Sequence, residues 1–214
     1  MILVFLIPAN VWSQEEFNKL NSKGERTGIW KKYYSNKNIR YQGQFKNGKE
    51  VGEFKYYSIV TSQHPTIIIN YDEKSSKATI SYFTEEGIKE SDGELLGKER
   101  NGKWTFYHPD GKTVMIEEHY NKGILNGSYK SFYSTGKPLE ILNYINGVLN
   151  GPSKRHADNG VLLDDLNYVN GKLHGKANYY NLEGKLIYTG MYENDVKVGF
   201  WDYFGDGENV KENN

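Results

Sequence analysis

Large apolar and aromatic residues return along the chain with a period of about 24 residues, in step with glycine. The glycines that mark the period, the anchor glycines, are Gly28, Gly52, Gly102, Gly127, Gly151, Gly175 and Gly199. The long interval between Gly52 and Gly102 contains one further unit, in which Ala78 occupies the anchor position. A fixed period with several matching offsets is the signature of a repeat architecture. The chain is therefore expected to repeat one small structural unit.

Within each unit, the spacing of large side chains fits two short strands joined by turns. A large apolar residue stands two positions after most anchors, as Trp30, Trp104 and Trp201 do, and an aromatic residue often stands five positions after. A second glycine follows at the ninth position, and Asn-Gly closes several units, at 47–48, 146–147 and 170–171. Asn-Gly is a strong hairpin signal because type I′ turns need positive φ at both central residues. We predict an all-β fold, an extended antiparallel meander of about eight 24-residue β-hairpin repeats.

The array is expected to span residues 28–207, with polar flanks on both sides. Residues 15–27 predict an N-terminal cap or first strand, and the charged residues 208–214 predict a flexible tail. The second unit carries extra residues, 58–65, before the apolar run that follows, and these predict a lengthened loop.

Residues 1–14 begin with the apolar run MILVFLIPANV, which is too short to cross a bilayer as a helix. A run of this length suits the apolar part of a secretory signal, and Ser13-Gln14 offers a small-residue cleavage neighbourhood. Residues 1–14 are therefore interpreted as a signal peptide, and the protein as exported to the periplasm, the cell surface or the medium. The alternative is a buried first strand, in which case the protein would stay in the cytoplasm.

Several units resemble MORN repeats, and more specifically the variant found in bacterial YwqK-type antitoxins. The residues that carry the resemblance run from Asn150-Gly151-Pro152 to Tyr168-Val169-Asn170-Gly171, and from Gly175 to Tyr192-Glu193-Asn194. The shared pattern is a Gly-x-Trp opening, an aromatic residue, a turn glycine and a closing Tyr-x-Asn-Gly. The resemblance implies an elongated, curled β-sheet with a binding role. The antitoxin label implies that such a protein neutralises a partner protein by contact.

Composition narrows the function classes further. The chain has 18 Tyr, 9 Phe, 4 Trp and 23 Gly, which favours many short strands and tight turns. Its 27 basic and 27 acidic residues cancel, so the general electrostatic signature of a nucleic-acid-binding protein is missing and no nucleic acid partner is expected. The absence of Cys excludes disulfides, thiolate metal sites and a cysteine nucleophile.

Candidate chemistry is sparse, and we expect no enzyme, no cofactor and no metal site. The five histidines lack metal-ligand spacing, and no strained Gly-x-Ser-x-Gly turn or phosphate-binding glycine loop is present. The adjacent acidic pairs Glu117-Glu118 and Asp164-Asp165 would point to opposite faces of a strand. The histidines are therefore interpreted as turn and ladder residues, His64, His108, His119, His156 and His174.

The aromatic residues have two interpretations, as the core of the array or as a binding surface. Tyrosine offers a large contact area at low entropic cost, which suits a binding surface. In aromatic doublets, one ring points opposite to its neighbour along the strand. Candidates for exposed, partner-binding rings are Tyr34, Tyr56, Tyr133 and Tyr179.

Charge is unevenly distributed, although it cancels overall. Residues 15–55 contain ten Lys/Arg against five Asp/Glu, whereas residues 181–214 contain three against seven. One interpretation is that the basic end binds an acidic partner or lipid headgroups, or pairs head-to-tail with the acidic end. The alternative is an ordinary solvated surface.

The function predicted from the sequence is that of an exported, non-enzymatic module that binds a protein partner through its sheet face or edge. Two alternatives stay open: an antitoxin or immunity protein that neutralises a toxin by contact, and a peripheral module that binds membrane lipid or glycan. Free sheet edges also make self-association a candidate interaction.

Overall fold

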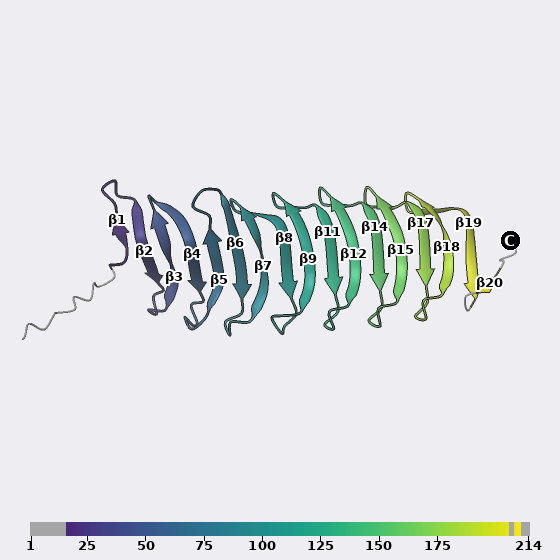
Figure 1. Cartoon of the computed structure of the whole chain (residues 1–214), viewed down its shortest axis with the longest axis horizontal. Coiled ribbons are helices and arrows are strands. Elements are labelled where there is room, and N and C mark those ends of the chain that lie inside the picture. The colour runs from purple at the N-terminus through teal and green to yellow at the C-terminus, as the bar shows by residue number, and fades with distance from the viewer. Residues whose placement is uncertain (1–15, 206–207, 211–214) are drawn as a thin grey trace, which may run out of the picture.

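The computed structural model describes residues 16–205 and 208–210, which form strands, turns and loops. Within them, twenty strands make one sheet (Figure 1). The first nine strands are β1 (Lys19–Leu20), β2 (Arg26–Tyr33), β3 (Ile39–Lys46), β4 (Lys49–Tyr57), β5 (Pro65–Tyr71), β6 (Lys77–Phe83), β7 (Lys89–Leu96), β8 (Glu99–Tyr107) and β9 (Val114–Asn121). The others are β10 (Ile124–Leu125), β11 (Gly127–Phe132), β12 (Pro138–Ile145), β13 (Val148–Leu149), β14 (Gly151–His156), β15 (Leu162–Val169), β16 (Lys172–Leu173), β17 (Gly175–Tyr180), β18 (Leu186–Glu193), β19 (Val196–Gly205) and β20 (Glu208–Val210).

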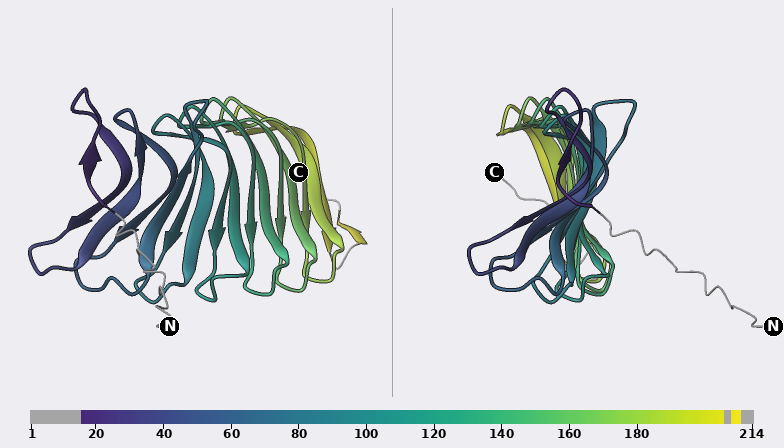
Figure 2. Two further views of the ribbon diagram at one scale, coloured as in Figure 1. Left: turned by 60° about the vertical axis from the view of Figure 1, so that its left-hand side comes forward. Right: turned by 90° about the vertical axis from the view of Figure 1, so that its left-hand side faces the viewer.

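The strands follow one another across the sheet in chain order, and every pairing is antiparallel. Three strands are divided into a short and a long part, β10 with β11, β13 with β14, and β16 with β17, each pair lying against the same neighbours. The sheet is a single bent and twisted layer, as Figure 2 shows. The predicted all-β antiparallel meander is confirmed. Among the described residues there is no helix that could span a membrane.

Two-residue turns close most of the hairpins along one rim of the sheet, where some connections, such as residues 72–76 between β5 and β6, are longer. Asn47 and Gly48 have φ of 50° and 77°, and Asn146 and Gly147 have φ of 50° and 80°. These are the positive values that a type I′ turn requires, so the Asn-Gly pairs act as the sequence predicted. The turns along the other rim are longer, and five of them are closed by the second glycine of the unit, whereas Lys37 takes that place in the first turn and the loop between β4 and β5 contains no glycine. At one of them, the Gly111 N–H donates to the carbonyl of His108 at 2.8 Å.

Each hairpin with a long turn contains a one-residue β-bulge just before that turn. The register shifts between the fourth and fifth positions after the anchor, for example between Lys32 and Tyr33 and between Tyr179 and Tyr180. The same shift occurs at the equivalent place in the other hairpins with long turns. A bulge adds local twist and bends the strand, so its repetition along one rim helps to twist and bend the whole sheet.

The largest buried side chains lie on one face of this single layer and are rings packed against the neighbouring strand, and smaller core residues include Ala78, Ile80 and Ala177. Phe54 and Trp104 are fully buried there, although no second layer covers them. Phe54 lies on Gly43, and Trp104 lies on Gly93, where an added Cβ would come within 2.4 Å and 2.3 Å of the rings. Glycine at these two positions lets the rings touch the backbone of the preceding strand, and that contact removes them from water.

The ends and irregular units are arranged as follows. Residues 1–14, interpreted as a signal peptide, lie outside the described residues. The cap contributes β1, and β2 begins at Arg26. Within the segment expected to be a flexible tail, Glu208–Val210 pair with β19 as β20. The lengthened loop runs from Ser58 to His64, between β4 and β5, and Ala78 is a buried residue of β6.

Candidate functional site

The two faces of the sheet differ in chemistry. One face, the aromatic face, carries Trp30, Trp104 and Trp201, together with the residues that alternate with them in register. The opposite face, the polar face, carries ion pairs such as Lys103 with Glu117 and Lys55 with Glu53, the latter at 2.8 Å. Exposed ion pairs of this kind contribute little to stability and keep a surface wet. The aromatic face is therefore the better candidate for a binding surface.

One line of paired residues crosses the aromatic face from β2 to β19, and each member is the direct partner of the next. We call it the cross-strand row. Its fifteen members are Lys32, Tyr41, Tyr56, Ile67, Tyr82, Ser91, Phe106, Ile116, Ser131, Glu140, Arg155, Asp164, Tyr179, Tyr188 and Tyr203. Most of these side chains are half-buried by their neighbours on the same face. The row therefore presents ring edges and faces to solvent without exposing whole rings.

Aromatic rings pack against one another along both ends of the cross-strand row. Tyr179 stacks on Tyr188 with ring centroids 4.3 Å apart and an interplanar angle of 23°, and Tyr188 stacks on Tyr203 at 6.0 Å. At the other end, the rings of Tyr41 and Tyr56 lie 5.9 Å apart. Such pairs contribute about 0.5–1.5 kcal/mol beyond the burial of their area. The contacts fix the rings in place before any ligand binds.

Between its two aromatic ends, the cross-strand row has a charged stretch, the tenth to twelfth of its fifteen members, which we call its polar centre. Arg155 lies between Glu140 and Asp164 in register, and its Nε donates to Asp164 Oδ2. This hydrogen bond with Asp164 raises the pKa of the Arg155 guanidinium. A hollow of about 530 Å³ adjoins this ion pair and is also lined by Tyr179 and Tyr188. The row thus combines a charged centre with stacked rings beside it.

Three cations lie over the rings of the aromatic face, and each stands two residues before an anchor glycine. Arg100 Cζ is 4.4 Å from the ring centre of Trp104, Arg26 Cζ is 5.0 Å from that of Trp30, and Lys197 Nζ is 4.2 Å from that of Trp201. These are cation–π contacts, which are worth about 0.5–1 kcal/mol at exposed sites. They place positive charge on both ends of the face and near its middle.

Two tyrosines of this face, Tyr71 and Tyr179, hold their protons more tightly than free tyrosine does. Burial raises the pKa of Tyr179, and the hydroxyl of Tyr192, 3.4 Å away, adds to the effect. Burial likewise raises the pKa of Tyr71, with further contributions from Tyr56 and Glu50. The hydroxyls of Tyr71 and Tyr179 therefore stay neutral at physiological pH.

The structure separates the four tyrosines that the sequence singled out. Tyr56 and Tyr179 belong to the cross-strand row, whereas Tyr34 and Tyr133 follow the strands β2 and β11 and are half-buried under the next repeat. Their hydroxyls donate to the carbonyls of Tyr57 and His156, both at 2.9 Å.

The expected exposure of these four rings is not observed, because all of them are half-buried. In the doublet Tyr33-Tyr34, the first ring is the exposed one, at 52%. Tyr34 and Tyr133 lie beyond the bulge before the long turn, where one extra residue on the partner strand breaks the simple alternation. Tyr56 and Tyr179 precede the bulge, and the neighbouring rings of Tyr41 and Tyr188 pack against them.

Comparison with known proteins bears on this geometry. The family model of the MORN repeat variant matches three stretches of the chain, residues 26–47, 100–122 and 125–146. Each stretch begins within two residues of the anchor position and contains the anchor glycine, Gly28, Gly102 or Gly127, with the hairpin that follows it. MORN repeats are typically modules that bind proteins or membranes. A search of the curated proteins finds no match.

The anchor glycines share one backbone requirement, which explains their recurrence. All seven have positive φ, from 63° at Gly52 to 116° at Gly127. Residues with a side chain rarely adopt this conformation. The smaller φ values occur where the anchor glycine lies within one continuous strand. The larger φ values occur where the strand is divided, at Gly127, Gly151 and Gly175.

Two features of the site were missed from the sequence, although a signal for each is present. Glycines at 43, 93 and 190 lie nine residues before the anchors Gly52, Gly102 and Gly199, which begin three of the four units with Phe or Trp two residues after the anchor. The cations that cover the three tryptophan rings, Trp30, Trp104 and Trp201, stand two residues before the anchor of the same unit. Neither spacing could be interpreted from the sequence, because the register is needed to see that the residues it links lie on the same face.

The histidines make structural contacts. The ring Nε2 of His108 is 3.1 Å from the carbonyl of Phe132, and Nδ1 of His119 is 3.0 Å from the carbonyl of Ser128. Each contact joins neighbouring repeats or strands, in keeping with turn and ladder roles. Residues 16–205 and 208–210 contain no group of three side chains arranged to hold a metal ion.

Proposed function

We propose that this protein is an exported, non-enzymatic repeat module that binds a protein partner through the aromatic face of its sheet. The observation that carries the proposal is the cross-strand row, a continuous line of half-buried side chains on an open face. Tyrosine, tryptophan and arginine, which supply much of this face, dominate the binding energy of protein interfaces. Because the rings are already packed against each other, little side-chain freedom would be lost on binding.

The layout of the row describes the partner surface that would fit. Apolar groups of the partner would lie against the tyrosines at the two ends of the row. A polar or charged group would lie near Arg155, whose guanidinium is half-exposed beside Asp164. A toxin neutralised by contact is one such partner, and the resemblance to YwqK-type antitoxins favours that narrower function.

The proposal is tested by photo-crosslinking in the native cells. A benzoylphenylalanine is placed at Tyr82 or Tyr203 on the aromatic face, and at Lys130 or Lys154 on the polar face as matched controls. We expect adducts with one protein from the aromatic face and none from the polar face. Adducts from the polar positions alone would contradict the proposal. The captured protein is then expressed alone, and toxicity that this chain suppresses would support the antitoxin function.

Export is part of the proposal and rests on the apolar residues 1–14. The test is N-terminal sequencing of the protein recovered from cell fractions. A mature chain that begins near Glu15 in the periplasmic, surface or secreted fraction would support export. A chain that retains residues 1–14 in the cytoplasm would contradict it.

A second candidate function is peripheral binding to anionic membranes or to glycans. The observation in its favour is the three cations held over rings on the aromatic face, Arg26, Arg100 and Lys197. Co-sedimentation with phosphatidylglycerol vesicles, but not with phosphatidylcholine vesicles, would support lipid binding. An Arg100→Gln variant should then bind more weakly, and added salt should release the protein. Retention on a polysaccharide column that Tyr188→Ala abolishes would instead favour a glycan.

A further inference from the structure

The first long strand of the array, β2, has its outer edge covered from Arg26 to Lys31 and open at its end. β1 pairs with Arg26 and Thr27, and the N–H of Asn18 donates to the carbonyl of Ile29 at 2.9 Å. The N–H of Lys31 in turn donates to Asn18 Oδ1 at 2.8 Å. Among the described residues, no strand continues this cover along the end of β2, at 32–33. The outer edge is therefore closed near the start of β2 and open near its end.

The last long strand, β19, has the opposite arrangement. β20 pairs with Tyr203, Phe204 and Gly205 at the end of the strand. On the side away from β18, no strand in the described part of the chain pairs with residues 196–202. The edge of β19 is therefore open near its start and closed near its end.

The two partly covered edges are complementary, because β2 and β19 occupy the same place in the repeat. Arg26, Gly28 and Trp30 of β2 correspond to Lys197, Gly199 and Trp201 of β19. In this alignment, β1 and Asn18 cover the part of β2 that corresponds to the open part of β19. β20 covers the part of β19 that corresponds to the open end of β2. Both short strands run antiparallel to the long strand they cover. If β19 of one copy is placed next to the β1–β2 end of a second copy, β20 of the first copy and β1 of the second would lie end to end between β19 and β2. The two short strands would then form the two parts of one strand that runs in a single direction.

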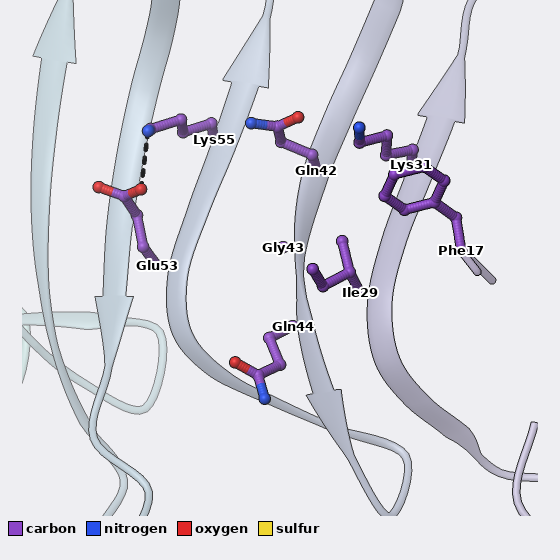
Figure 3. A pocket seen from close by; sticks show the side chains of 8 residues that line it. All are labelled: Phe17, Ile29, Lys31, Gln42, Gly43, Gln44, Glu53 and Lys55. Atoms are coloured by element: carbon purple, nitrogen blue, oxygen red, sulfur yellow. Dashed lines mark ion pairs between the residues drawn. The ribbon is translucent and has the colours of Figure 1, made fainter. Parts of the chain in front are cut away.

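The side chains at these edges support the same arrangement. Phe200 of β19 is 99% exposed on the polar face, which is unusual for a large apolar residue in a strand. Its counterpart in β2 is Ile29, which lines a hollow of about 340 Å³ with Phe17, as Figure 3 shows. The ring of Phe17 lies under the ammonium group of Lys31, 3.8 Å away. A β2 end brought next to β19 would place Phe17 and Ile29 beside Phe200.

We propose that copies of this chain associate head to tail, with β19 of one copy against the β1–β2 end of the next. The charges of the two ends favour this contact, since residues 15–55 are basic and residues 181–214 are acidic. A contact between two different surfaces leaves the other surface of each copy free, so further copies can add in line and continue one sheet. The inference is independent of the proposed partner, because the aromatic face stays open along such an assembly.

Sedimentation velocity of the full chain over a range of concentrations tests the proposal. We expect the average mass to rise above 24.7 kDa with concentration and to fall with added salt. Phe200→Asp and Phe17→Asp each place a carboxylate in the apolar contact, from the two opposite sides. Each should weaken association about tenfold or more, while thermal unfolding of the monomer changes little. The matched control is Val60→Asp, at a residue 72% exposed in the loop between β4 and β5.

Mixing the two variants separates head-to-tail contact from every symmetric one. The Phe200→Asp chain keeps an intact N-terminal end, and the Phe17→Asp chain keeps an intact C-terminal end. Their mixture should therefore stop at dimers of one chain of each kind, with no longer species. A wild-type chain that stays monomeric at all concentrations would overturn the proposal. So would association that persists in both single variants, or a mixture that forms no mixed dimer.

Discussion

The indole ring of Trp104 lies against the backbone of Gly93 on the preceding strand. A Cβ added to Gly93 would sit 2.3 Å from Trp104 Cδ2, a distance that real Cβ atoms do not reach. The ring is 1% exposed, and its Nε1 donates to the carbonyl of Glu94 at 2.9 Å. Phe54 on Gly43 and Trp201 on Gly190 repeat the arrangement. This contact gives a single-layer sheet buried residues without a second layer.

Substitution of Gly93 should therefore destabilise the array by overpacking. We expect Gly93→Ala to lower the free energy of unfolding by about 1–3 kcal/mol, measured by urea denaturation. In a Trp104→Val background the same substitution should be much less harmful, because the ring that it meets is gone. An equal loss in both backgrounds would mean that the Trp104 ring is not the cause.

The anchor glycines should be sensitive to substitution for a reason of backbone conformation alone. Gly52 has φ of 63°, and a Cβ built on it meets no atom within 4 Å. Gly52→Ala should lower the free energy of unfolding by about 1–2 kcal/mol, and Gly52→Asn should lower it less. The nearby exposed substitution Lys49→Ala serves as the control and should change it by less than about 0.5 kcal/mol. Thermal melts of the three variants check the order.

The hydroxyls of Tyr34 and Tyr133 join the long turns that follow β2 and β11 to the next repeat. Tyr34→Phe and Tyr133→Phe should each lower the free energy of unfolding by about 0.5–1.5 kcal/mol, because each removes one hydrogen bond to a carbonyl. The exposed Tyr33 provides the control substitution, Tyr33→Phe, which should have little effect on stability. Loss of partner crosslinking without loss of stability would instead assign Tyr34 and Tyr133 to the interface.

Stability should fall in alkaline solution because of the tyrosines on the aromatic face. The pKa values of Tyr71 and Tyr179 are raised in the folded chain above the ordinary value of 10.0, chiefly by burial. The folded state thus holds these protons more tightly than the unfolded state does. Their contribution is complete below about pH 10 and is lost as the pH rises beyond it towards the folded values. Urea midpoints should be flat from about pH 7 to pH 9 and should fall above pH 10, less so in the Tyr71→Phe/Tyr179→Phe variant.

The repeat and its hairpins could be predicted from the sequence because their determinants are local. A turn such as Asn146-Gly147 needs positive φ at two adjacent residues, and these two residues supply it. The anchor glycines could be recognised for the same reason, because each supplies a positive φ at its own position. The degenerate unit around Ala78 was placed correctly by its spacing, since β6 begins at Lys77.

Which side chains share a face could not be predicted as well, because that depends on pairing between strands. One bulge before each long turn moves the fifth residue after the anchor out of the alternation, as at Tyr33. The polar centre of the cross-strand row joins Glu140, Arg155 and Asp164 from three separate strands. No local pattern marks these residues as neighbours. Their proximity follows only from the register.

Two strands per repeat give the array a built-in unit of length. Neighbouring strands lie about 4.8 Å apart, so equivalent side chains recur about every 10 Å along the sheet. The cross-strand row from Lys32 to Tyr203 therefore extends for roughly 65–70 Å. Loss or duplication of one 24-residue unit would move everything beyond it by one such step without changing which face it occupies. The distance between two equivalent sites on the sheet is therefore set by the number of repeats between them. A partner that contacts two such sites would bind only where that number matches its own spacing.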